Sequence, residues 1–569
     1  MKKINYLTIL LLALFALSSC GGINKMKKEA SSVNYEVTPE ILETHGGEVA
    51  FTVKGVFPEK YFSKKALVEA TPVLVYENGE TAFSSVTLQG EKIQANNKEI
   101  AYVEGGSFTH SDKVAYNEDM KKSELILRVT ASQGSKSVDF DPVKLADGVV
   151  ATSTLVQKEP KPVLVGDKFQ RIVPDEKTAA IMFLINRADL RNSELTKEEI
   201  KLLEEYMKEV AEAENKEFKG INIHAYASPD GPYDFNEDLA ERRKQAANNY
   251  LERTLKRHNI EVEDASFALK STAEDWEGFK KLMEASDIPD KDLILRVLSM
   301  YSDPAVRERE IKNMAATFEI LKDDILPKLR RSELNVNVNL IGYSDEEILD
   351  YIDSQPDLLG LEEILYAAKL TEDPAKKVKI YQYAGERYPQ CFRAFNGEGC
   401  FQLKMGNIDE AEAAFNKAKA LQDNDVVKNN LGFIALLKGE TEKAEELFSA
   451  VEKPTYETQY GLGTIAIIKG NYDDAKNFLK DKPSYNLALA TLLDGDATAA
   501  RNILGNVDSD NAWVYYLKAV AGARLGDEDY MTNNLRSAVA QNSQLKDYAK
   551  TDMEFYRYFE SDTFKSIVE

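Results

Sequence analysis

The chain has 569 residues, of which 43% are hydrophobic and 29% charged, a size and composition that fit about three or four globular domains. Its 72 basic and 95 acidic side chains give a net charge of −23. This charge argues against nucleic-acid binding and against a broad basic membrane-binding face. Three cysteines and four histidines are too few for a disulfide scaffold or a repeated zinc-finger array.

Residues 1–19 have the pattern of a secretory signal peptide. Lys2 and Lys3 precede an apolar run from Tyr6 to Leu17, and its 12 residues fall short of the roughly 18 needed to span a bilayer. The sequence that follows, LSSCG at 17–21, resembles the lipobox of bacterial lipoproteins. The resemblance implies that Cys20 is acylated, palmitate included, and that the protein is held in the outer membrane facing the periplasm. The alternative is an ordinary leader with an incidental cysteine.

The N-terminal part of the mature chain is predicted to be all β. We expect residues 20–31 to be a lipid-anchored tether and residues 32–158 to form a sandwich of five to eight strands, because apolar residues such as Val49, Phe51 and Val53 alternate. The dipeptide at 78–79, Asn-Gly, predicts a tight hairpin turn. The sequence KEPKP at 158–162 predicts a stiff linker.

Residues 166–345 alternate between strand and helix patterns and predict an α/β domain. Strands are expected at 179–185 and 221–228, a helix from Asn236, and a final strand with Leu334, Val336 and Val338 on one face. Three further helices, around 276–285, 291–300 and 307–326, are expected as an insertion before that final strand.

The segment from Ile221 to Leu251 resembles the peptidoglycan-associating domain of OmpA-like proteins, and its Ser-Pro-Asp-Gly loop is similar to that of OmpA-family lipoproteins of Bacteroidota. The family spacing is matched by Gly231, Asn236, Leu239 and Arg243. In the family an aspartate and an arginine clamp the diaminopimelate of the peptide stem.

The resemblance implies four candidate peptidoglycan-binding residues. Arg243 matches the family arginine, and Asn236 keeps its family place, whereas the family aspartate falls on Ser228. Asp230, two residues later, is the candidate replacement for the missing carboxylate. The alternative is that Arg243 only forms ion pairs on the helix surface with Glu237 or Glu241.

The C-terminal third contains a repeat. Glycines recur at 406, 439, 470, 495 and 526, and their intervals of 33, 31, 25 and 31 residues are close to the tetratricopeptide period. Residues 355–545 therefore resemble a tetratricopeptide array, and the aromatic tail at 546–569 is expected to cap it. Such an array implies a concave groove that holds a peptide or helix from an envelope protein. Cys391 and Cys400 are expected to be free thiols.

The predicted architecture is multidomain: an all-β sandwich, an OmpA-like α/β domain with a helical insertion, and an all-α repeat solenoid. No nucleophile elbow, phosphate loop, metal site or cofactor site is recognisable, so we expect no enzyme activity. The sequence favours an outer-membrane lipoprotein that associates with peptidoglycan and presents its repeats to an envelope partner. The alternative is an assembly factor or surface antigen whose OmpA-like domain has lost peptidoglycan binding.

Overall fold

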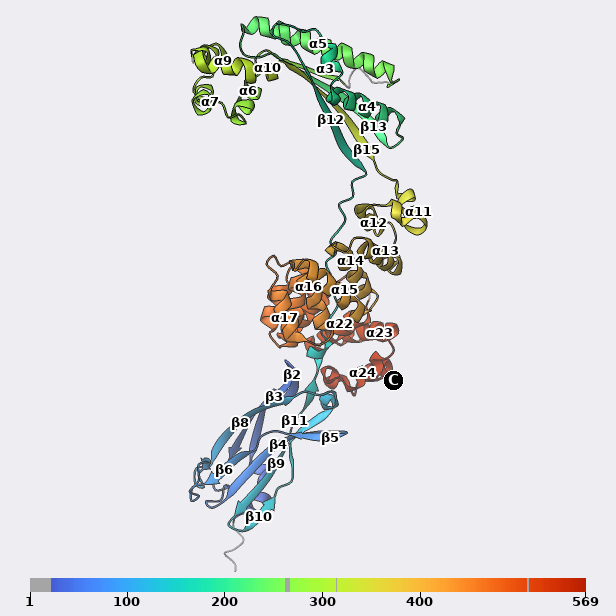
Figure 1. The fold of residues 1–569 in the computed structure, drawn as a ribbon. Coiled ribbons are helices and arrows are strands. Elements are labelled where there is room, and N and C mark those ends of the chain that lie inside the picture. The colour runs from blue at the N-terminus through green and yellow to red at the C-terminus, as the bar shows by residue number, and fades with distance from the viewer. Residues whose placement is uncertain (1–21, 261–266, 314, 509–510) are drawn as a thin grey trace, which may run out of the picture. The chain divides into compact units, whose positions relative to one another are not determined.

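The computed structural model describes residues 22–260, 267–313, 315–508 and 511–569, so the predicted signal peptide and Cys20 lie outside the described residues. The chain forms two compact units (Figure 1). One contains the residues up to Val165 together with Asp373–Glu569, and the other is Gly166–Glu372. The N-terminal β region and most of the C-terminal helices therefore pack as one body. No helix in the described ranges is long and apolar enough to cross a membrane.

The N-terminal region contains eleven strands, more than predicted, in two sheets that share one core. The first sheet consists of β1 (Asn34–Thr38), β2 (Ile41–His45), β3 (Glu48–Phe57) and β8 (Gly106–Ala115). The second consists of β4 (Leu67–Tyr76), β5 (Gly79–Ala82), β6 (Val86–Gly90), β7 (Lys98–Ile100), β9 (Ser123–Gln133), β10 (Lys136–Asp139) and β11 (Val143–Val150). A parallel pairing of β2 with β11 joins the sheets. Two short helical turns, η2 (Glu118–Lys121) and η3 (Thr152–Leu155), complete the region.

The predicted hairpin forms with its turn one residue earlier than expected. Tyr76 is paired with Gly79, so Glu77 and Asn78 are the two loop residues. Gly79 begins β5 and does not have a positive φ. A Cβ at Gly79 would meet the Tyr76 ring at 3.4 Å, an ordinary van der Waals distance, so neither φ nor space requires glycine at this position.

The described part of the predicted tether, residues 22–31, is mostly helical and packs on the sandwich. Helix α2 (Ile23–Lys28) is followed by η1 (Ala30–Ser32). Ile23 and Met26 are buried in the sandwich core, and the Tyr61 hydroxyl donates to the Met26 carbonyl at 3.0 Å. Amphipathic spacing of these two apolar residues, three apart, places them on one face of the helix.

The second unit is built on a four-stranded sheet in the order β12-β15-β13-β14. Its strands are β12 (Ile172–Met182), β13 (Lys216–Tyr226), β14 (Phe267–Thr272) and β15 (Arg331–Ile341). Only β13 and β14 pair in parallel. After the short helix α3 (Asn192–Leu195), α4 (Glu198–Glu212) and α5 (Tyr233–Arg257) pack on the apolar face of the sheet, where Leu334, Val336 and Val338 are buried as predicted. The α/β class is thus confirmed, with β12 beginning earlier than the predicted strand.

The expected insertion is present, with five helices where the sequence predicts three. It consists of α6 (Trp276–Glu284), α7 (Lys291–Met300), α8 (Pro304–Lys312), α9 (Ala315–Asp324) and α10 (Leu326–Leu329), around a small core of its own. The single helix expected over 307–326 is therefore two helices. The unit also includes α11 (Asp345–Ser354), η5 (Pro356–Leu358) and α12 (Leu361–Ala367), which the sequence assigns largely to the repeats. Arg171 holds them to the sheet by pairing with Asp345.

The C-terminal helices form a solenoid of antiparallel pairs (Figure 1). They are α13 (Pro374–Arg387), α14 (Phe392–Lys404), α15 (Ile408–Leu421), α16 (Asp425–Leu437), α17 (Thr441–Ser449), α18 (Tyr456–Ile468), α19 (Tyr472–Leu479), α20 (Tyr485–Leu493), α21 (Ala497–Gly505), α22 (Ala512–Leu525) and α23 (Glu528–Gln541). All five repeat glycines end a helix with φ between 70° and 96°, the left-handed conformation that glycine adopts without strain. The tail folds as α24 (Leu545–Thr551), η6 (Met553–Tyr558) and α25 (Asp562–Val568), and buried Phe555 and Phe564 cover the last repeat.

Candidate functional site

The groove of the solenoid holds a segment of the same chain, residues 157–163, which we call the groove segment. At the C-terminal end of this segment, one side-chain amide binds both the N–H and the carbonyl of Val163. The Val163 N–H donates to Asn430 Oδ1 at 2.7 Å, and Asn430 Nδ2 donates to the Val163 carbonyl at 3.0 Å. Asn396 Nδ2 donates to the same carbonyl at 3.1 Å. Both asparagines are fully buried, so their amides are satisfied by the segment and by each other.

The same two-way bond recurs at the other end of the groove segment. The Gln157 N–H donates to Asn486 Oδ1 at 3.0 Å, and Asn486 Nδ2 donates to the Gln157 carbonyl at 2.8 Å. The hydroxyls of Tyr460 and Thr464 accept from the Asn486 amide and fix its orientation. Such an amide accepts from the N–H and donates to the carbonyl of the same residue. It therefore recognises the main chain of that residue, whatever side chain the residue carries.

The middle of the groove segment is held by a third asparagine and by an aromatic ring. Asn429 Nδ2 donates to the Lys161 carbonyl at 3.3 Å, and the Thr458 hydroxyl donates to Asn429 Oδ1 at 3.0 Å. The Lys161 ammonium lies over the Tyr460 ring, 4.6 Å from its centroid. The contacts to the groove segment come from α14, α16, α18 and α20, the first helices of successive repeats. The KEPKP stretch is therefore a bound segment instead of the free stiff linker expected.

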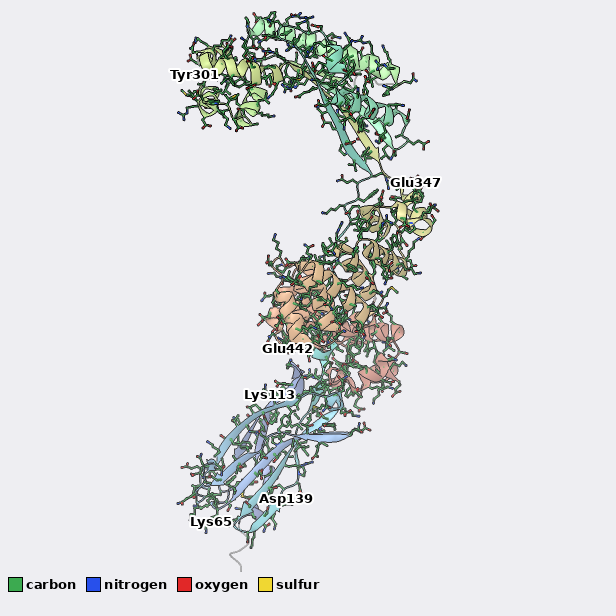
Figure 2. All side chains as sticks on the ribbon, in the orientation of Figure 1. Lys65, Lys113, Asp139, Tyr301, Glu347 and Glu442 are labelled. Carbon is green, nitrogen blue, oxygen red and sulfur yellow. The ribbon has the colours of Figure 1, made fainter. Side chains whose placement is uncertain are left out.

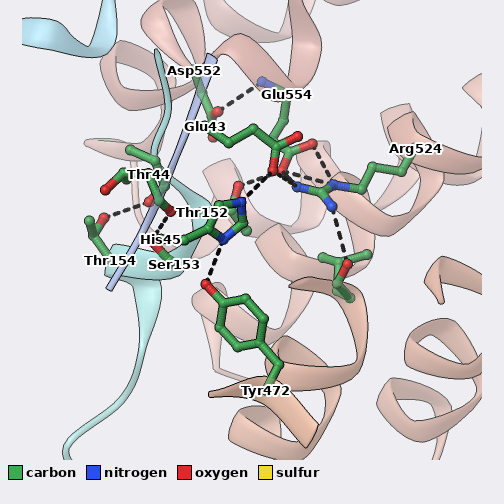
Figure 3. Close-up of polar contacts among 12 residues, drawn as sticks. Glu43, Thr44, His45, Thr152, Ser153, Thr154, Tyr472, Arg524, Asp552 and Glu554 are labelled. Atoms are coloured by element: carbon green, nitrogen blue, oxygen red, sulfur yellow. Dashed lines mark hydrogen bonds and ion pairs between the residues drawn. The ribbon is translucent and has the colours of Figure 1, made fainter. Parts of the chain in front are cut away.

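Polar contacts fix two further elements of the β region to the solenoid (Figure 3). One is η3, which directly precedes the groove segment, and the other is β2. The Arg524 guanidinium pairs with Glu554 at 2.6 Å and lies 3.7 Å from Glu43 of β2. His45 Nδ1 lies 2.7 Å from the Tyr472 hydroxyl oxygen. The Thr152 hydroxyl donates to Glu554 as well. These contacts make the sandwich and the solenoid one unit.

Burial and charge shift the ionisation of this junction. Burial alone raises the pKa of Glu43, but the hydrogen bond with His45 and the charge of Arg524 outweigh it, so this pKa is below its ordinary value. Asp552, nearby and fully buried, behaves oppositely. Burial, followed by the charge of Glu554, raises the pKa of Asp552 to about 6.

In the α/β unit the loop after β13 brings together three of the four candidate residues, but around a partner that the sequence did not indicate. Arg330 Nη2 donates to Asp230 Oδ2 at 3.1 Å, and its Nε donates to the Ser228 hydroxyl at 3.1 Å. Ser228 in turn donates to the Asp230 carboxylate. Asn236 Nδ2 donates to the carbonyls of Ser228 at 3.0 Å and Gly231 at 3.1 Å, which fixes the loop.

Arg243 is placed differently from either expectation. Its side chain is fully buried and makes neither the clamp with Asp230 nor surface ion pairs. Its three nitrogens donate to main-chain carbonyls of Arg187 at 3.0 Å, Tyr226 at 2.8 Å and Leu184 at 3.1 Å. Burial, with a smaller effect from the charge of Arg330, lowers its pKa to about 10. The guanidinium thus links the segment that follows β12 to the end of β13.

The space beside Asp230 is too small for an amino-acid ligand. The cavity there has a volume of about 10 Å³, roughly that of one water molecule. Trp276, Phe279 and Leu326 of the insertion form its apolar wall. In this conformation the insertion and Arg330 therefore close the place where the resemblance implies diaminopimelate.

His224 is packed between two hydroxyl groups. Its ring nitrogens are each 2.7 Å from a hydroxyl, Nε2 from Thr272 and Nδ1 from Tyr226. Burial lowers the pKa of this imidazole. Across the described ranges no group of three His, Cys, Asp or Glu side chains is placed to hold a metal ion. Cys391 and Cys400 are free thiols, as predicted.

Sequence reasoning missed Arg330 and the groove asparagines. Arg330 follows the insertion, a hundred residues after the loop it contacts, and carries no local motif. Asn396 and Asn430 do carry a signal, because they are 34 residues apart, one tetratricopeptide period. A buried polar residue repeated at the repeat period on first helices indicates a groove that binds main chain.

Comparison with known proteins supports the repeat assignment over one segment. Residues 392–425 match the family model described as tetratricopeptide repeat. No curated protein matches the chain. Together with the helix pairs and their left-handed glycines, the match shows that the C-terminal region contains tetratricopeptide repeats, a module of protein–protein interaction.

Solved structures similar to the chain are repeat proteins of low identity. YrrB, described as a TPR protein with an unusual peptide-binding site, is 16% identical over 30% of this chain and 98% of its own, with a TM-score of 0.25. PilW, a type IV pilus biogenesis factor, is 14% identical over 40% of this chain and 96% of its own, with a TM-score of 0.28. A tetratricopeptide repeat protein from Parabacteroides merdae is 12% identical over 43% and 98%, with a TM-score of 0.30. Similarity at this level supports no functional argument.

Proposed function

We propose that the protein is a non-enzymatic scaffold of the bacterial outer membrane, attached through lipid on Cys20, whose repeat solenoid binds a segment of an envelope protein. The observation that carries the proposal is the groove, in which Asn430 and Asn486 each bind both polar groups of one residue's main chain. A groove with this chemistry recognises an extended peptide. The lipobox-like sequence before Cys20 supports the attachment.

The groove segment defines what the partner must offer. It contributes main-chain N–H and C=O groups at two positions six residues apart, Gln157 and Val163, and a cation over Tyr460 between them. An envelope partner that uses the groove therefore presents an extended stretch of comparable length with a basic residue in its middle, and it displaces the groove segment.

For the α/β unit we adopt the alternative of the sequence-based hypothesis, in which the OmpA-like domain no longer binds peptidoglycan. Asp230 is already paired with Arg330, and Arg243 has no exposed surface. We expect the mature chain to be retained on purified sacculi no better than an Asp230→Asn variant. Retention that is lost on this substitution would show that the insertion opens and that the wall contact exists.

The scaffold proposal is tested in cells. Metabolic labelling with an alkyne fatty acid is expected to label the wild-type chain and not a Cys20→Ser variant, which should leave the membrane fraction. Cross-linking mass spectrometry of envelopes should identify a partner segment linked to the solenoid, with more of that product when Gln157 and Val163 are both replaced by proline, because the groove segment then lacks the two N–H groups that it donates to Asn486 and Asn430 while both amides stay in place. Partner cross-links confined to Gly166–Glu372, or a Cys20→Ser chain that stays in the membrane, contradict the proposal.

A further inference from the structure

The sandwich contains a basic pocket beside α2, lined by none of the residues of the two sites described above. It has a volume of about 410 Å³, within the roughly 300–1,000 Å³ of small-molecule sites. Ser63 and five lysines line it: Lys25, Lys60, Lys64, Lys65 and Lys92. Figure 2 shows Lys65 and Asp139 at one end of the sandwich and Lys113 toward the other.

Main-chain bonds hold the lysines of the pocket together. The Lys60 N–H donates to the Tyr102 carbonyl at 2.6 Å, with Lys60 itself at a φ of 61°. The Lys92 N–H donates to the Lys64 carbonyl at 2.8 Å. The turn that carries Lys92 starts at Gly90, where a Cβ would lie 2.2 Å from the Ser63 carbonyl oxygen, so only glycine allows this close approach.

The pocket keeps a local positive charge within an acidic chain. Lys64 is paired with Glu91 at 2.9 Å, and Lys25 lies 3.8 Å from Glu29. The other three lysines have no ion pair with any residue that the structure describes. Five cations and two paired carboxylates leave three positive charges around one cavity, whereas the whole chain carries −23. An anion in the cavity would offset the mutual repulsion of these ammonium groups.

The position of the pocket indicates where that anion comes from. Gly22 lines the pocket, and α2, which starts at Ile23, is packed on the sandwich core. Cys20 is three residues before Ile23, and a chain of three residues spans at most about 11 Å. A lipid on Cys20 therefore keeps the mouth of the pocket at the level of the headgroups of the bilayer.

We infer that this pocket binds the phosphate of an anionic phospholipid headgroup next to the lipid anchor, an inference that rests on the proposed acylation of Cys20. Lysine ammonium groups bind phosphate as flexible point charges, and Ser63 adds a hydroxyl donor. The contact would orient the sandwich on the membrane, which a lipid chain alone does not do. It differs from a broad basic face because it is confined to one cavity.

The test uses the full mature chain with Cys20→Ser, so that it carries no lipid, and vesicles of phosphatidylcholine with or without 20% phosphatidylglycerol. At low salt, sedimentation should show roughly 10-fold or stronger partitioning to the anionic vesicles. A triple variant, Lys60→Glu, Lys65→Glu and Lys92→Glu, should lose that preference, and so should the neutral glutamine triple if the glutamate one folds poorly. The matched control is Lys201→Glu, Lys280→Glu and Lys379→Glu, which makes the same charge change at exposed helical lysines and should keep the preference.

Equal loss in the control would mean that diffuse charge is responsible, and absence of any anionic preference in the parent chain would also overturn the inference. Tight binding of inorganic phosphate without vesicle binding would identify a site for a soluble anion instead. Because the tested chain carries no lipid, none of these results depends on acylation. A failed fatty-acid labelling of Cys20 would instead refute the anchoring on its own.

Discussion

The solenoid groove and the loop after β13 differ in how the chain fills a place where the sequence predicts a ligand. In the groove the occupant is main chain, held by amides that would bind the main chain of another peptide equally well. At the loop the occupants are the Arg330 side chain and the apolar insertion, around a cavity of about 10 Å³. The first kind of filling can be exchanged for a partner, whereas the second excludes one unless the insertion moves. Arg243 is the residue that best distinguishes a purely structural role of this loop from a role in ligand binding.

The largest effect is expected when Arg243 is replaced by alanine. The substitution removes one donor from each of three carbonyls, at roughly 1–3 kcal/mol for a buried one. We expect about 3 kcal/mol in total, because two of the three lie on exposed residues and the Leu184 carbonyl still accepts from the Arg187 N–H. Urea unfolding followed by Trp276 fluorescence, in a Trp513→Phe background, measures the loss in this unit.

The matched control for Arg243 is its neighbour. Arg242 is half-exposed, and its one ion pair with the residues that the structure describes is with Asp238 on the same helix, so Arg242→Ala should cost less than about 0.5 kcal/mol. If both alanine variants are equally stable, the carbonyl contacts of Arg243 contribute little, and a role in ligand binding becomes the better interpretation.

The next largest effect concerns the groove. Replacing both Asn430 and Asn486 by alanine removes the two-way bonds, so hydrogen exchange at the amides of Val163 and Gln157 should accelerate by about 100-fold, equivalent to about 2.7 kcal/mol of lost protection. Asn506→Ala is the control, because its amide donates only within α21. Unchanged exchange at Val163 in the double variant would show that the segment is not held by the groove.

A pH-dependent change in stability is expected in the first unit. The folded-state pKa of Asp552 is raised to about 6, first by burial and then by the charge of Glu554, while the Tyr516 hydroxyl bonded to it and the charge of Lys121 act in the other direction. A raised pKa means that folding favours the protonated carboxyl. This stabilisation is complete below about pH 4 and is lost as the pH rises through 6.

Asp552→Asn imitates the neutral carboxyl and serves as the test. The variant should match the wild type at pH 4 and exceed its stability at pH 8. Thermal unfolding is followed by the fluorescence of Trp513, whose ring lies 5.7 Å from that of Tyr516, in a Trp276→Phe background. Parallel pH profiles for the two proteins would contradict a buried ionisation at this position.

The features of this structure that the sequence predicts are those that depend on residues close to one another in the chain. The repeat glycines and the alternation of Leu334 to Val338 depend on neighbouring residues, and the structure has them as predicted. The hairpin turn lies at 77–78, one residue before the Asn-Gly pair, because Tyr76 pairs with Gly79 across it.

The candidate sites depended on contacts between distant parts of the chain. Ser228 and Asp230 were identified, but the charge that Asp230 faces comes from a residue a hundred positions later. The groove was predicted, yet its occupant lies 267 residues before Asn430. No spacing rule connects a Pro-containing linker to an amide in a later domain, since the pairing exists only once the sandwich is docked on the solenoid by the contacts of Arg524.

The smallest effect is expected from Lys161→Met, which keeps the stem of the side chain and removes the charge over the Tyr460 ring. A cation at 4.6 Å from a ring, half-buried in the groove, contributes about 0.5–1 kcal/mol. Exchange at the Val163 amide should therefore accelerate by only about two- to five-fold, since the bonds of Asn430 remain. Lys158→Met, on the same segment but without a ring beneath it in the described chain, should leave the rate unchanged. An effect of Lys161→Met as large as that of the double asparagine variant would mean that the groove selects its occupant by charge rather than by main chain, and any partner would then have to be sought by its basic residue first.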